Sequence, residues 1–503
     1  MITMLGSKRR CCDGMTRRET LKAGALTALG GFSLADLLRA EAAAGTTTRR
    51  GKAKNVMLLF LLGGAPTQDM WDLKPEAPDG IRGEFKPVAT NVPGIQISEH
   101  LPRTTKWLDR MAIVRSVNHK AGCHNTLPCY TGYEVPVADN TITKDGFPPS
   151  MGSVCEWLRL NGGLPSDGAG PTRQRGGPNY AAPHGGPDMP AYFYLPCYLG
   201  WGQAIRRAGP YAGFLGKRCD PIFTECAPFM DKDAPAPAPG TPRTVRGEPF
   251  LPNSVLEGGL TIDALNSRRT LLSQVDEQLR RGEAQNAFTS FDRYQQRAFD
   301  VLTSSTMRAA FDLAHEDPKL VDRYGRTLFG NSSLIGRRLI ESGVRFVNVT
   351  WDLFWDRIKI DYDAWDTHTR NFSILKDNKL PGLDQTYTAL LEDLEHRGLL
   401  DETLVVIMSE MGRTPKINGS AGRDHWTYCY SVVLAGAGIR GGSVYGASDA
   451  HAAYVKDKPV STSDICATIY ECLGIDSDMT VPDRTGRPVP IAHGGRPIRE
   501  ILA

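Results

Sequence analysis

The stretch VMLLFLLGGAPTQDMWD, residues 56–72, decides the fold class, because a continuous apolar run leads directly into two glycines and then polar side chains. Uninterrupted runs of large apolar residues are typical of strands that are buried on both faces of a parallel sheet. In open α/β proteins, ligands bind beyond the carboxyl ends of such strands. The stretch therefore predicts the first strand of an α/β domain, with Asp69 and Asp72 near its functional edge.

Other parts of the chain repeat this pattern and alternate with helical ones. Four more apolar runs predict strands: Met111–Val117, Val344–Thr350, Leu404–Met408 and Ser431–Ala435. Apolar residues at helical spacing predict a helix over 383–398, and a second helix over 461–474 begins with a capping-box sequence at Ser461. Alternating strands and helices predict an α/β fold built on a mostly parallel sheet.

The remaining segments predict insertions within one domain, which spans residues 45–503. Residues 161–190 and 227–253 are rich in Gly and Pro, which is typical of irregular surface loops. Residues 260–342 are mostly helical in pattern and carry many charges, so we interpret them as a helical insertion and not as a separate module.

Residues 1–44 have the features of a twin-arginine signal peptide. TRRETLK at 16–22 precedes a mildly apolar run over 23–38 and a small-residue exit at 40–44. The apolar run contains Asp36 and is shorter than the roughly 20 residues that span a bilayer, so no stable membrane span is expected after processing. An ordinary amphipathic N-terminal helix is the alternative. The leader predicts a periplasmic or secreted protein.

The net charge indicates whether the protein binds nucleic acid, and the cysteine content indicates whether it has disulfides or CxxC motifs. The net charge is +3, and residues 1–44 already supply seven basic against four acidic side chains, so the rest is near neutral. No basic surface for nucleic acid is predicted. Nine cysteines follow the leader without a paired CxxC motif. Disulfides between Cys123 and Cys129 or between Cys219 and Cys226 are possible, but buried thiols are the preferred interpretation.

Potential metal ligands accompany the predicted strands. These residues are Asp69 after the first strand, His119 and His124 after the second, Asp366 and His368 after the third, Glu410 and Arg413 after the fourth, and Arg423 and His425 before the fifth. Carboxylates and imidazoles together suit a divalent ion such as zinc or manganese, and arginine suits an oxyanion.

Each candidate residue has a simpler alternative role. Asp366 and His368 could form a hydrogen-bonded turn, and Glu410 could form a structural salt bridge. His425 could pack beside Trp426, and Asp69 could cap the next segment. The ordered set supports a site more strongly than any single member does.

The sequence closely resembles the exported proteins grouped as domain of unknown function 1501, which are placed in the alkaline phosphatase/sulfatase superfamily. The segments that carry the resemblance are 63–75, 81–87, 95–102, 365–372, 408–415, 422–426 and 441–449. The resemblance implies an alkaline phosphatase-like three-layer domain. It also implies a divalent metal (zinc, manganese or calcium), with Asp366 and His368 as the middle ligand pair and His425 as the late histidine.

The chain departs from the superfamily pattern at three places. Met411 replaces the histidine expected after Glu410, and the first strand ends in Gly63-Gly64 with no acid until Asp69. The position expected for the nucleophile holds Gly122, and Cys123 and Thr126 are the nearest candidates.

Two main functions follow from this sequence. The first is a metal-dependent hydrolase of sulfate or phosphate esters, with an anionic ester or carbohydrate as substrate. In it Asp366, His368, Glu410, His425 and Asp69 hold the ion, His124 is a general acid or base or a further ligand, and Arg413 faces the anion. The second is a catalytically inactive protein that binds a sugar or anion in the same crevice. An isomerase or mutase is a third option.

Overall fold

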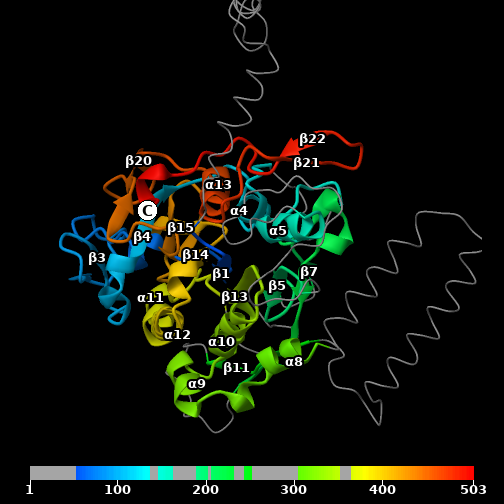
Figure 1. Ribbon diagram of the computed structural model, residues 1–503. Helices are drawn as coiled ribbons and strands as arrows, with labels where there is room; N and C mark the ends of the chain where they lie inside the picture. Colours follow the sequence, from blue (N-terminus) through cyan, green and yellow to red (C-terminus); the bar gives the residue numbers. More distant parts are fainter. Residues whose placement is uncertain are drawn as a thin grey trace, which may run out of the picture. The chain divides into compact units, whose positions relative to one another are not determined.

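Eight strands form the central sheet of this computed structural model, which describes residues 52–135, 145–162, 189–201, 205–230, 243–251, 304–351 and 364–503 (Figure 1). The strands are, in spatial order, β18 (Ser443–Tyr445), β4 (Met111–Val117), β17 (Tyr430–Gly436), β14 (Thr403–Met408), β1 (Asn55–Leu61), β13 (Phe346–Trp351), β5 (Tyr192–Leu195) and β8 (Ile222–Phe223). All neighbouring strands are parallel except that β17 runs antiparallel to both β14 and β4. The five predicted strands are confirmed as β1, β4, β13, β14 and β17.

Helices cover both faces of the sheet, which confirms the predicted three-layer α/β class. One layer contains α4 (Leu127–Thr131), α5 (Met151–Leu160) and α13 (Thr462–Cys472), and the opposite layer contains α10 (Leu328–Glu341) and α12 (Leu380–His396) (Figure 1). Side chains alternate along β1, so that Leu58 and Phe60 pack with the first layer while Leu59 and Leu61 pack with the second. This burial on both faces explains why the strand reads as an unbroken apolar run.

Smaller elements surround the three layers. The short helices are α3 (Thr67–Met70), α8 (Ser305–Phe311), α9 (Pro318–Tyr324) and α11 (Asn371–Ile374), and a π-helical turn, Leu375–Lys379, joins α11 to α12. Two-stranded ribbons are formed by β15 (Gly412–Ile417) with β16 (Arg423–Trp426), β19 (Ala447–Ser448) with β20 (Val455–Asp457), β2 (Pro87–Ala89) with β3 (Gln96–Ser98), β21 (Thr480–Pro482) with β22 (Pro488–Pro490), β6 (Gly200–Trp201) with β7 (Ile205–Arg206), β9 (Glu225–Cys226) with β12 (Pro249–Phe250), and β10 (Phe229–Met230) with β11 (Val245–Arg246).

Several predicted segments lie wholly or mostly outside the described residues. These are the predicted leader at 1–44, most of the Gly/Pro-rich segments at 161–190 and 227–253, and residues 260–303 of the helical segment. The last part of that segment forms α10, which packs on β13 in the core, so this helix belongs to the α/β layers and not to an insertion.

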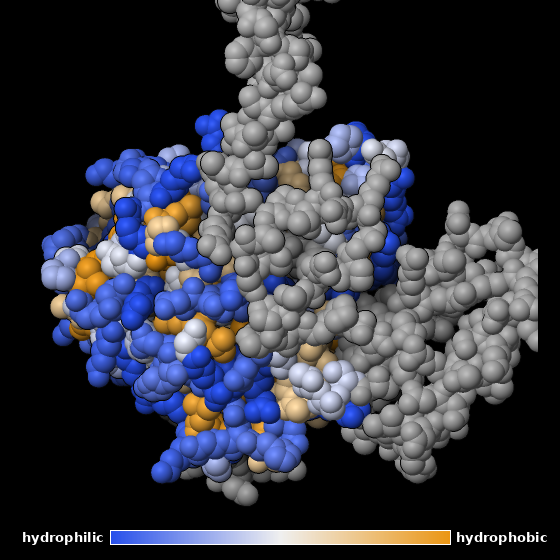
Figure 2. Space-filling view, in the orientation of Figure 1, coloured by the Kyte–Doolittle hydropathy of each residue, from blue (hydrophilic) through white to orange (hydrophobic). Residues whose placement is uncertain are grey.

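The surface and the cysteines agree with an ordinary globular domain. The coloured part of the face shown in Figure 2 is mostly hydrophilic, with hydrophobic residues in small separate patches. The nine cysteines from Cys123 onward are thiols, and all except Cys123 are buried, as the preferred interpretation predicted. None of the helices in the described ranges combines the length and apolar character needed to cross a membrane.

The capping box of α13 supports a stability prediction. The Ser461 hydroxyl accepts the N–H of Asp464 at 3.1 Å, and the Asp464 carboxylate accepts the N–H of Ser461 at 2.9 Å. We expect Ser461→Ala to lower the free energy of unfolding by about 1 kcal/mol, as measured by urea denaturation. Ser461→Thr, which keeps the acceptor, is the control and is expected to lose less. Equal stability of the alanine variant and the wild type would contradict this role.

Candidate metal centre

The antiparallel direction of β17 explains how the candidate ligands reach one edge of the sheet. His124 follows β4, Asp366 lies beyond β13, and Glu410 follows β14, so all three lie at the carboxyl ends of parallel strands. His425 lies on β16 and precedes β17. Because β17 runs the other way, its amino end lies at this same edge. The loops before and after different strands therefore converge.

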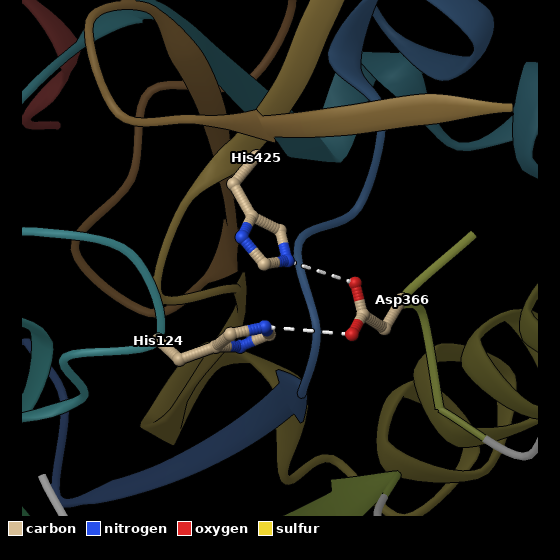
Figure 3. A group of neighbouring side chains, drawn as sticks. All are labelled: His124, Asp366 and His425. Atoms are coloured by element: carbon tan, nitrogen blue, oxygen red, sulfur yellow. Dashed lines mark hydrogen bonds and ion pairs between the residues drawn. The ribbon is translucent and has the colours of Figure 1, made fainter. Parts of the chain in front are cut away.

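His124, Asp366 and His425 are close enough to bind a single ion, since one ligand atom from each lies within 4.8 Å of the others. Both imidazoles point toward the Asp366 carboxylate, and each contacts a different oxygen (Figure 3). The Nε2–oxygen distances are 3.4 Å for His124 and 3.1 Å for His425. The donor set of two imidazoles and a carboxylate fits a borderline divalent ion.

His368 brings a third imidazole to this group. Its Nε2 lies 3.1 Å from Asp366 Oδ1 and 2.8 Å from Nε2 of His425. Two imidazole nitrogens at this distance either share a proton or direct their lone pairs at a common cation. The arrangement therefore presents three Nε2 atoms around one carboxylate.

Two carboxylates hold the far nitrogens of these histidines. Glu410 contacts Nδ1 of His124 at 3.0 Å, and Asp424 contacts Nδ1 of His368 at 2.8 Å. Histidines that bind metals usually donate their second N–H to such a partner, which leaves the other nitrogen available for the ion. Glu410 thus orients His124 and does not itself point at the triad.

The charges of the site suit a divalent cation. Burial alone would raise the pKa of Asp366, but hydrogen bonds from His124 and His425 and the charge of Arg413 outweigh it and hold this pKa far below its usual value. Burial would also raise the pKa of Glu410, but the contact with His124 lowers it. Asp366, Glu410 and Asp424 therefore bring three carboxylates to the histidines, and Arg413 and Arg207 are the cations beside them.

The pKa of His124 and that of His425 move in opposite directions. Burial would lower the pKa of His124, but hydrogen bonds to Asp366 and Glu410 raise it overall. For His425, burial dominates and the pKa is lowered. Carboxylates at both nitrogens of His124 thus favour positive charge at this point, which a proton or a metal ion can supply.

Arg413 was predicted to face the anion, but its guanidinium is fully buried and does not line an open anion site. It donates to the backbone carbonyls of Gly63, Gly64, Trp365 and Arg423 and pairs with the Asp366 carboxylate. With its donors used within the protein, Arg413 positions Asp366 instead of contacting a ligand.

Asp69 lies outside the metal group in the structure, so its predicted role as a ligand is replaced by an ion pair. Both of its oxygens contact Arg423, at 2.7 and 2.9 Å, and Asn371 donates to it at 2.9 Å. Asp72 is likewise paired with Lys74, at 2.9 Å, and accepts the hydroxyl of Ser448. Neither carboxylate has an oxygen directed at the three histidines.

Two glycines allow the loops of the site to meet. A Cβ on Gly63, which has a φ of 110°, would lie 2.6 Å from the nitrogen of Asp366. A Cβ on Gly422 would lie 1.8 Å from the carbonyl oxygen of His368. The N–H of Gly63 also donates to both oxygens of Glu410, at 2.8 and 3.1 Å. The backbone of Gly63 thus anchors the carboxylate of Glu410.

No hydroxyl in the described part of the second loop takes the place of the expected nucleophile. Gly122 has a φ of 91° and no side chain, and the buried hydroxyl of Thr126 donates to the carbonyl of Ala208. Cys123 is exposed as a residue, yet partial burial of its thiol group together with nearby carboxylates raises its pKa despite the charge of Arg413.

Sequence reasoning missed two contributors to the site. Asp424 stands directly before His425, yet its partner is His368, a contact between loops that local sequence does not indicate. Arg207 is buried beside the site, where it donates to the carbonyl of His124 and helps to lower the pKa of Glu410. It follows a Gly/Pro-rich region, and no nearby motif marks it.

Comparisons with known structures give several chains to which this one is weakly similar. A sulfatase, PsFucS1 from Pseudoalteromonas sp., is 12% identical with a TM-score of 0.35, and the match covers 91% of this chain and 72% of that one. The phosphonate monoester hydrolase SpPMH from Silicibacter pomeroyi is 12% identical with a TM-score of 0.33, over 89% and 76% of the two chains. BT4656, in complex with its substrate D-glucosamine-2-N,6-O-disulfate, is 12% identical with a TM-score of 0.31, over 89% and 82%.

Comparisons at the level of sequence identify the family. A search of curated proteins finds no match. The family model described as "Protein of unknown function (DUF1501)" matches residues 53–502, which is most of the chain. This chain therefore belongs to the DUF1501 family.

Proposed function

We propose that this chain is a metal-dependent hydrolase of sulfate or phosphate esters, exported by the twin-arginine route. The observation that supports it best is the meeting of three Nε2 atoms at the Asp366 carboxylate, with Glu410 and Asp424 behind two of the rings. We assign His124, Asp366, His368 and His425 as the ligands. Three imidazoles favour zinc or manganese over calcium, which takes oxygen ligands.

The chain's own residues would prepare this centre before substrate arrives. Glu410 fixes the ring of His124, and the N–H of Gly63 fixes Glu410 in turn. Hydrogen bonds from His124 and His425, together with the charge of Arg413, lower the pKa of Asp366 and favour its ionised form. A divalent ion bound there would polarise a sulfuryl or phosphoryl oxygen and lower the pKa of bound water.

Ester turnover by the mature, metal-loaded protein tests this proposal. We expect it to hydrolyse para-nitrophenyl sulfate or para-nitrophenyl phosphate, and to lose that turnover after chelation and regain it with zinc or manganese. Release of para-nitrophenol gives the rate, and elemental analysis of the same sample gives the metal content. The protein treated with chelator and then reloaded serves as the control for irreversible damage.

A second function is favoured by the loop that should carry a nucleophile. The expected position holds Gly122, and Thr126 uses its hydroxyl within the protein. A protein that retains stoichiometric metal but turns over neither ester would support a catalytically inactive protein that binds a sugar or anion at this centre, and would contradict the hydrolase.

A further inference from the structure

Three aromatic side chains cluster beside the candidate metal centre. Trp426 lies 5.0 Å from Tyr428 and 5.5 Å from Tyr454 between ring centroids, and the two tyrosines lie 5.8 Å apart. Tyr428 and Tyr454 are 46% and 54% exposed, although large aromatic rings are usually buried for most of their area. We call these three residues the aromatic platform.

The platform is held in place by specific contacts and is not a chance exposure of loose side chains. The indole N–H of Trp426 donates to the carbonyl of Ala453 at 2.5 Å. The Asp449 carboxylate accepts the N–H groups of His451, Ala453 and Tyr454 at 2.8 to 3.2 Å, which fixes the turn that presents Tyr454. The two segments that carry the rings are therefore joined to each other.

The platform is linked to the metal centre through the chain and through His119. Trp426 directly follows His425 on β16. His119 donates its backbone N–H to Thr427 at 3.0 Å, while its ring nitrogen contacts the carbonyl of Glu410 at 2.7 Å. Successive strand residues point to opposite faces, so Trp426 lies on the face of the β15–β16 ribbon opposite His425. A molecule that reaches both must extend beyond a single small ester.

The chemistry of the platform fits a carbohydrate chain. Sugar rings carry an apolar C–H face and a polar rim, and Trp and Tyr likewise combine an apolar ring with a polar tip. The rings are inclined to one another by 50 to 66°, so they offer several facets and not one flat surface. Lys456 and Asp457 are exposed nearby in the sequence, so charged side chains border the three rings.

We propose that Trp426, Tyr428 and Tyr454 bind a polysaccharide chain and hold it across the β15–β16 ribbon from the metal centre. This rests on the proposed hydrolase function and names its substrate class, an ester carried on a carbohydrate polymer. The tyrosine rings cover C–H faces of successive sugar units, and their hydroxyl groups meet the polar rims.

Affinity electrophoresis of the mature protein tests the platform with three probes: dextran, dextran sulfate and chondroitin sulfate. We expect at least one of them to retard the wild-type protein. The double variant Tyr428→Ser with Tyr454→Ser should bind that polymer about tenfold more weakly. The double variant with Phe at both positions should retain most of the binding, because the rings remain. Phe229→Ala removes a ring that is also 54% exposed elsewhere on the chain, and it is the matched control.

Several outcomes would overturn the platform. The first is that none of the three polymers retards the wild-type protein. The second is that the wild type and the serine double variant are retarded equally, which would indicate attraction by charge alone. The third is that binding of single-stranded DNA depends on the tyrosines as strongly as binding of the polymer does. The metal content and ester turnover of the wild-type protein test the hydrolase separately. A chain that holds no metal but is retarded through its tyrosines keeps the platform and loses the hydrolase.

Discussion

Replacing His425 with alanine is expected to abolish stoichiometric metal binding by the mature protein. After loading with zinc or manganese, we expect about one ion per wild-type chain and nearly none in the variant. His425 Nε2 lies 3.1 Å from Asp366 Oδ1 and 2.8 Å from His368 Nε2, so the substitution removes the donor atom that lies between two other proposed ligands. The His425 side chain is only partly buried, so we expect the fold to tolerate its replacement. Elemental analysis after gel filtration gives the metal content.

The control for His425→Ala is His451→Ala. His451 is exposed, and its backbone N–H keeps the contact with Asp449 when the ring is removed. Full metal content in the His425 variant would rule out the proposed ligand set. Metal-free protein in both the wild type and the variant, after loading, would favour the catalytically inactive binding protein.

Replacing Asp69 with alanine is expected to destabilise the protein by about 3–5 kcal/mol, because it leaves a fully buried guanidinium without its counter-charge. Arg423 is completely buried, and Asp69 accepts two of its N–H groups. The rest of the guanidinium contacts backbone carbonyls of Ile81, Thr414 and Pro415, which carry no full charge. Urea denaturation gives the loss in the free energy of unfolding.

The exposed pair between Arg82 and Asp79 provides a matched control for Asp69. Their side chains are 48% and 92% exposed, so Asp79→Ala should change stability by less than about 1 kcal/mol. Folded Asp69→Ala protein should still bind metal, since Asp69 does not reach the histidines. Loss of metal with unchanged stability would instead restore Asp69 as a ligand.

Much of the fold could be predicted from the sequence because the central strands are buried on both faces. The runs at β1, β4, β13, β14 and β17 are continuous and apolar for this reason. The direction of β17 could not be predicted, since strand direction depends on which neighbours it pairs with and not on its own residues. The edge strands β8 and β18 were missed because two or three residues are too few to show a pattern.

The sequence predicted which residues meet at the candidate site better than it predicted the role of each residue. His124, Asp366, His368 and His425 converge because strand ends deliver them to one edge. The pairing of charges could not be read in the same way. Arg413 meets Asp366 and Arg423 meets Asp69 across gaps of 47 and 354 residues, and only the assembled loops decide which carboxylate neutralises which guanidinium.

The close approach of Gly63 to Asp366 and of Gly422 to His368 predicts which residues related sequences should conserve. Either glycine could change only if the loops separated, whereas a metal ligand could be lost while the loops stay packed. In a relative that has abandoned metal but kept this architecture, the glycines should outlast the histidines. A relative that keeps the ligand histidines but has a bulky residue at the position of Gly63 or Gly422 would have to bring its metal ligands together through a different loop arrangement. We therefore expect the glycines to be conserved for loop packing and the histidines to be conserved for metal binding, independently of each other.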